Sequence, residues 1–176
     1  VTAPATATAT LTGGTDGVTT INAATLLGVD TLPRTGMYAL RGFGVAMGIL
    51  CDLTDTTSWA TQQAFGSGEG VYMILAGAAS QSISSAVSAK SAAGLDTYAC
   101  KVIHGDWPYW FDTTNGITQR LVSPQPFAGG LLACLSPQHS TLNKPLYGVV
   151  GTQKSATGLP YTTADLQTLA PVRFSS

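Results

Sequence analysis

The chain has 176 residues, 44% of them apolar, and a formal net charge of −1. This is enough length and apolar material for one domain with its own core, and it excludes a disordered chain. The eight basic residues are scattered, which argues against a nucleic-acid partner. No run approaches the roughly 20 apolar residues of a membrane span, so we expect no membrane partner.

In chain order, residues 1–10 form a Thr/Ala-rich stretch that we expect to be an extended lead-in, and residues 11–176 follow as one domain. Helical periodicity and capping residues predict one helical turn within 23–32, and helices at 34–43, 58–66, 80–93, 126–135 and 162–169. Compact apolar or alternating runs predict strands at 45–53, 71–76, 97–103, 107–112, 117–122 and 146–150.

Several local signals support these elements. The sequence Thr113-Thr114-Asn115-Gly116 predicts a hairpin turn, because Asn-Gly tolerates positive φ at both central positions. Gly94 is expected to end the helix before it, and Ser123 to cap the helix after it, with Pro124 near its first turn. Asp165 falls in the first turn of the last helix. Strands alternating with helices predict an α/β fold with a mixed, partly parallel sheet flanked by helices.

Charged side chains are scarce in this sequence. Asp, Glu, Lys and Arg make up 10% of it, against roughly 25% in ordinary globular domains. A surface with few charges loses little solvation when another protein covers it. The composition therefore suits a subunit packed on several sides, and a secreted or extracellular domain is the alternative that it leaves open.

The sequence predicts no metal or cofactor site. Cys51, Cys100 and Cys134 are widely spaced within apolar stretches, which predicts buried reduced thiols rather than disulfides or a zinc site. Two isolated histidines and one glutamate do not form a cluster of ligands. The run from Gly66 to Gly70 resembles a phosphate loop but leads into a strand, so it is interpreted as a plain turn.

Catalytic residues are limited to two histidines, His104 and His139, and no Gly-x-Ser-x-Gly elbow is present. His104 ends a predicted strand beside Asp106 and is an acid–base candidate. A strand-end histidine next to Trp107 is more typical of a packed structural residue. We therefore expect that the protein is not an enzyme, and an α/β hydrolase using His104 remains an alternative.

Trp107, Tyr109, Trp110 and Phe111 form a dense aromatic cluster. Such rings can stack on a sugar or a base. Alternation along a strand would split them between two faces, which favours core packing plus an interface patch. A carbohydrate-binding module using this cluster is a second alternative.

Five segments of the chain form a pattern when they are taken in order. They are Leu11-Thr12-Gly13-Gly14-Thr15-Asp16-Gly17; Arg34-Thr35-Gly36-Met37-Tyr38-Ala39-Leu40; Gly105-Asp106-Trp107-Pro108-Tyr109-Trp110-Phe111-Asp112; Leu121-Val122-Ser123-Pro124-Gln125-Pro126-Phe127-Ala128-Gly129-Gly130-Leu131-Leu132-Ala133; and Asn143-Lys144-Pro145-Leu146. Together they resemble the core of contractile phage tail-sheath proteins. Two features depart from the family pattern. Ser123-Pro124-Gln125-Pro126 replaces the usual Pro-Pro-Ser-Gly, and residues 136–140 lack the charges common after this helix.

The resemblance implies a structural subunit that assembles in hexameric rings around an inner tube and contracts to drive the tube through a target envelope. Its partners would be other sheath subunits, joined by strands donated from terminal arms, together with the tail tube and a baseplate. It would belong to the virion and assemble in the bacterial host cytoplasm. The family also carries an N-terminal arm and a C-terminal domain, so we expect residues 11–176 to be the core fragment of a longer subunit.

Overall fold

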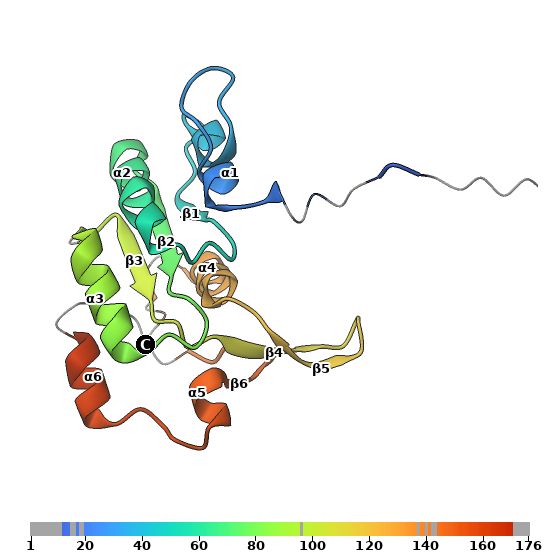
Figure 1. Cartoon of the computed structure of the whole chain (residues 1–176), viewed down its shortest axis with the longest axis vertical. Helices are drawn as coiled ribbons and strands as arrows, with labels where there is room; N and C mark the ends of the chain where they lie inside the picture. The colour runs from blue at the N-terminus through green and yellow to red at the C-terminus, as the bar shows by residue number, and fades with distance from the viewer. Residues whose placement is uncertain are drawn as a thin grey trace, which may run out of the picture.

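The computed structural model describes residues 12–14, 17, 20–95, 97–136, 138–139, 141 and 144–170. The predicted lead-in at 1–10 lies outside the described residues. The fold is mixed α/β with a parallel sheet flanked by helices, as predicted, although the strands divide between two sheets of three strands each (Figure 1). In the part of the chain that is described, no helix combines the length and apolar character needed to cross a membrane.

The first sheet is parallel, with β2 (Tyr72–Ala76) between β1 (Met47–Ile49) and β3 (Cys100–Ile103). The predicted strand at 45–53 is wrong in length, since only three of its residues pair. The chain turns away just after β1, where Asp52 adopts a left-handed conformation with φ 59°. A short edge strand therefore replaces the long buried one.

Helices cover both faces of the parallel sheet. The helices α2 (Trp59–Glu69) and α3 (Ile83–Ala93) lie on one side, and α4 (Pro124–Cys134) lies on the other (Figure 1). Strand side chains alternate between faces. The main core lies on the α2 and α3 side and includes Trp59, Phe65, Met73, Leu75 and Val102.

The run from Gly66 to Gly70 is not a plain turn, because α2 continues through it to Glu69. Only Gly70 leaves the helix, in a left-handed conformation that ends it. Gly66 is buried where α2 approaches β2, and a Cβ there would come within 2.6 Å of the Val71 carbonyl oxygen. Gly66 thus permits close packing of helix on strand.

The second sheet is antiparallel, with β4 (Pro108–Asp112) between β5 (Ile117–Leu121) and β6 (Val149–Thr152). The predicted hairpin turn is confirmed, but Gly116 is the residue in it with positive φ. Asn115 instead donates its backbone and side-chain N–H groups to the Asp112 carboxylate, at 3.2 and 2.8 Å. Arg120 pairs with the same carboxylate at 2.8 Å and closes the hairpin.

The remaining elements are short: α1 (Ala23–Leu27), the 3-10 helices η2 (Gly36–Leu40) and η3 (Thr56–Ser58), α5 (Gln153–Ala156) and α6 (Thr163–Leu169). The helix α5 was not predicted. Thr152 and Ser155 form a capping box at its start, and Thr162 and Asp165 form one at the start of α6.

The prediction of three buried thiols is wrong for two cysteines. Cys51 lies in the turn after β1 and Cys134 at the end of α4, and both are exposed, whereas Cys100 on β3 is half-buried. All three are free thiols. Apolar neighbours in the sequence did not predict burial here because both residues lie at element ends, where the chain returns to the surface.

Candidate functional site

A groove of about 660 Å³ runs along the face of the parallel sheet that carries α4. Tyr72 and Ile74 of β2 and Lys101 and Ile103 of β3 line one side of it, and α4 lines another. The wall is completed by Thr141, Lys144 and Leu146, and by Val149 and Thr152 of β6.

The placement of α4 explains why the groove exists. Gln125 is fully buried, and its Nε2 donates to the Ile74 carbonyl oxygen at 3.0 Å, which fixes the start of α4 to the central strand. Gly129 is buried against Ile49 of β1. The helix therefore contacts β1 and β2, and the groove remains over β2 and β3.

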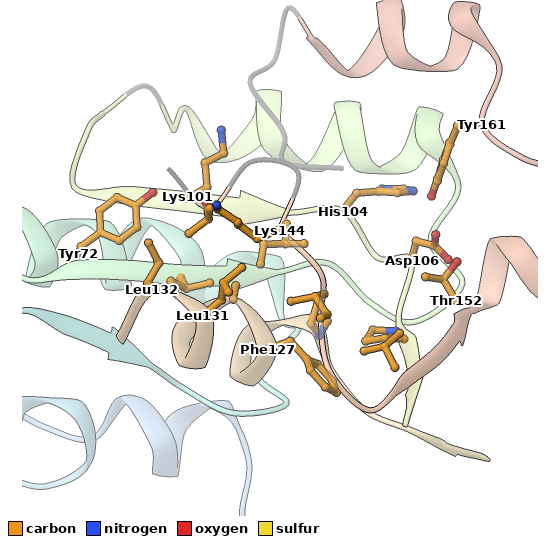
Figure 2. A pocket seen from close by; sticks show the side chains of 18 residues that line it. Tyr72, Lys101, His104, Asp106, Phe127, Leu131, Leu132, Lys144, Thr152 and Tyr161 are labelled. Carbon is orange, nitrogen blue, oxygen red and sulfur yellow. The ribbon is translucent and has the colours of Figure 1, made fainter. Parts of the chain in front are cut away.

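One end of the groove gathers polar groups from two segments that are distant in the sequence, residues 104–106 and 152–161. His104, Asp106 and Tyr161 point toward one another there (Figure 2). The Asp106 carboxylate accepts a hydrogen bond of 2.7 Å from the Lys154 backbone amide and another from the Tyr161 hydroxyl. The Lys154 ammonium lies 5.5 Å from the centre of the Tyr161 ring, and the His104 ring meets that ring edge-on at 6.1 Å.

Burial sets the protonation states at this end. The His104 side chain is 4% exposed, and desolvation lowers its pKa, with Lys154 adding to the effect and the Asp106 charge opposing it. The imidazole is therefore neutral near pH 7. Burial and the Asp106 carboxylate raise the pKa of the Tyr161 hydroxyl, which stays protonated and acts as a donor.

A neutral imidazole could act as a general base, but catalysis by acyl transfer also needs a nucleophile within reach. Apart from the phenols of Tyr72 and Tyr161, the hydroxyl groups in the described lining of the groove are those of Thr141 and Thr152, and this lining contains no serine or cysteine. Asp106 is used to hold Lys154 and Tyr161 in place. The predicted pair of His104 and Asp106 does come together, where the chain before β4 meets the segment from Lys154 to Tyr161.

The second histidine, His139, is exposed and does not line the groove. Among the described residues, no three His, Cys, Asp or Glu side chains gather in a way that could hold a metal ion.

The aromatic cluster is not part of the core, so the expected core packing is wrong. Phe111 is 46% exposed, and the other three rings are half-buried. The Trp107 indole donates to the Gly77 carbonyl oxygen at 3.0 Å, which turns it toward the corner between the sheets. The Trp110 ring packs on Gly148, where a Cβ would come within 2.7 Å of its Nε1.

Several residues of this site were not predicted: Lys101, Lys144 and Tyr161, which line the groove, and Lys154, which lies beside the Tyr161 ring. These side chains lie at one site because of how α4 packs on the sheet and where α5 lies. Thr152 was the available signal for α5, because threonine is a favoured N-cap residue and its hydroxyl here accepts from the Ser155 amide.

A scan against models of protein families finds no match to this chain, and a search of curated proteins likewise finds none.

Proposed function

We propose that this chain is the core of a contractile tail-sheath subunit, a structural part that assembles in hexameric rings around an inner tube. The proposal rests on the five segments that resemble the family in order along the sequence. Its partners would be other copies of the subunit, the tail tube and a baseplate. The proposed location is the virion, after assembly in the bacterial host cytoplasm.

The observation that supports this proposal most directly is the exposed outer edge of the antiparallel sheet. All five residues of β5 are exposed, and within the described residues β5 pairs with β4 alone. An exposed strand edge offers unpaired backbone groups to another chain. Subunits linked by donated strands need such an edge.

Exposed apolar side chains lie on all three strands of this sheet and just before β6. They are Phe111 on β4, Ile117 and Leu121 on β5, Val150 on β6, and Tyr147, which is 88% exposed. Apolar groups gathered at one sheet are typical of a surface that another protein covers. With so few charges in the chain, covering this surface would cost little in desolvation.

Negative-stain electron microscopy of the natural polypeptide that contains this sequence tests the proposal. The protein should be expressed alone and together with the proteins encoded beside it, because an inner tube can be needed to start assembly. Striated tubes or stacked rings of constant diameter are the expected result. Dispersed single particles under both conditions would contradict the proposal.

A further inference from the structure

The end of the groove opposite His104 carries two lysines. Lys101 on β3 and Lys144 both line it, near the Tyr72 hydroxyl (Figure 2). Neither lysine takes part in the ion pairs formed by the described residues. The carboxylate in the groove lining, Asp106, lies at the other end and is bound to Lys154 and Tyr161. Among the described residues that line the groove, no carboxylate lies at the lysine end, which therefore carries two positive charges.

The wall between the two ends is apolar. It is formed chiefly by Ile74 and Ile103 of the sheet and by Phe127, Leu131 and Leu132 of α4. The volume of about 660 Å³ lies within the range of small-molecule sites, which are mostly apolar with a few polar groups that fix orientation. The groove thus offers an apolar surface that ends in two ammonium groups.

We propose that this groove binds a medium-chain carboxylate, an amphiphile with one acyl chain and one anionic head. The head lies between Lys101 and Lys144, where two ammonium groups supply charge-assisted hydrogen bonds. The acyl chain lies along α4 and covers the apolar wall, which releases water from both surfaces. A cationic ligand would be repelled at this end, and a strongly polar one would leave the wall uncovered.

Isothermal titration calorimetry with sodium octanoate, below its micelle concentration, tests the site. We expect saturable binding of one octanoate per chain, and weaker binding of 1-octanol. The variants K101Q and K144Q should each weaken octanoate binding about two- to five-fold, the range for one partly exposed charge contact. The variant L132E, which places a carboxylate on the wall, should weaken it further.

The variant R34Q is the matched control, because it removes one positive charge from an arginine that does not line the groove. It should bind octanoate as the wild type does, and circular dichroism should show that all variants are folded. Equal affinity for octanol and octanoate would overturn the proposal, as would lysine variants that bind like the wild type. Binding to phosphatidylglycerol vesicles without binding to octanoate would overturn it too. None of these results bears on the sheath proposal, which does not depend on the groove.

Discussion

Gln153 and Ser80 exchange two hydrogen bonds although 73 positions separate them in the sequence. The Ser80 amide donates to Gln153 Oε1 at 2.8 Å, and Gln153 Nε2 donates to the Ser80 hydroxyl at 2.7 Å. The same Oε1 accepts from the Trp107 amide at 3.3 Å. One side chain of α5 therefore connects the loop after β2, the approach to β4 and its own helix, at the corner where the two sheets meet.

Replacing Gln153 should loosen this corner. The variant Q153A removes both acceptor and donor, and we expect it to lower the free energy of unfolding by about 0.5–1.5 kcal/mol, the usual net contribution of a hydrogen bond whose partners water can reach. Q153E keeps an acceptor for both backbone amides and should lose less. Urea unfolding followed by circular dichroism measures the difference. Equal stability of Q153A and Q153E would show that the amide bonds at this corner contribute little.

Two adjacent glycines of α4 should respond in opposite ways to alanine. A Cβ on Gly130 meets open space, so G130A should stabilise the protein by about 0.5–1 kcal/mol, the helix preference of alanine over glycine. A Cβ on Gly129 would clash with Cδ1 of Ile49. G129A should therefore lose that gain or destabilise the protein, because packed sites tolerate added atoms poorly. Thermal melting of the two variants side by side checks this, and a G129A protein as stable as G130A would contradict it.

The neutral state of His104 predicts a pH dependence of stability. Its folded pKa lies below the ordinary 6.5 because burial disfavours the charged ring, with Lys154 adding to the effect and Asp106 opposing it. Between the folded pKa and 6.5, the unfolded chain binds more protons than the folded one, so stability rises with pH. The stability that the neutral His104 ring contributes is fully present above pH 6.5. It is lost as the pH falls from 6.5 toward the pKa of His104 in the folded protein.

Urea midpoints measured from pH 4.5 to 7.5 should therefore fall on the acid side for the wild type. The variant H104Q should show a shallower fall, because it removes the titrating group. H139Q changes an exposed histidine outside the groove and should keep the wild-type slope. An unchanged slope in H104Q would assign the acid sensitivity to other groups.

The outer edge of β5 can be blocked without breaking the hairpin. The Val122 amide donates to the Pro108 carbonyl oxygen at 3.1 Å, and because backbone groups alternate along a strand, the Leu121 amide faces away from β4. L121P removes that outward N–H, whereas L121A keeps it. If neighbouring chains pair with β5, L121P should abolish rings and tubes seen by electron microscopy, and L121A should preserve them. Normal assembly of L121P would exclude this edge as the contact.

The sequence predicted best the elements that local residues determine. The helix α3 begins after Ser82, whose hydroxyl accepts from the Ser85 amide, and ends at Gly94 in a left-handed conformation. Both caps act within one turn of chain. The hairpin between β4 and β5 is equally local, since Asp112, Asn115 and Arg120 are close in sequence.

Elements that depend on distant packing were predicted less well. The strand β1 is shorter than its apolar run, and α2 passes through glycines that suggested a turn because β2 lies against Gly66. The groove was not predicted at all, since Lys101, Lys144 and Tyr161 come from separate parts of the chain and meet only once α4 has packed on the sheet. His104 and Asp106 were the residues of this site that could be found, because they are neighbours in the sequence.

The order of strands along the chain has a consequence for folding during synthesis. Only β4 and β5 are joined by a tight turn, whereas a helix separates β1 from β2, β2 from β3, and β5 from β6. Closing long loops costs chain entropy before any contact is gained, so the hairpin should form rapidly and the parallel sheet slowly. Until α2 and α3 have closed over it, β2 is an unprotected apolar strand. We therefore expect aggregation of newly made chains to begin at β2 and not at the exposed β5.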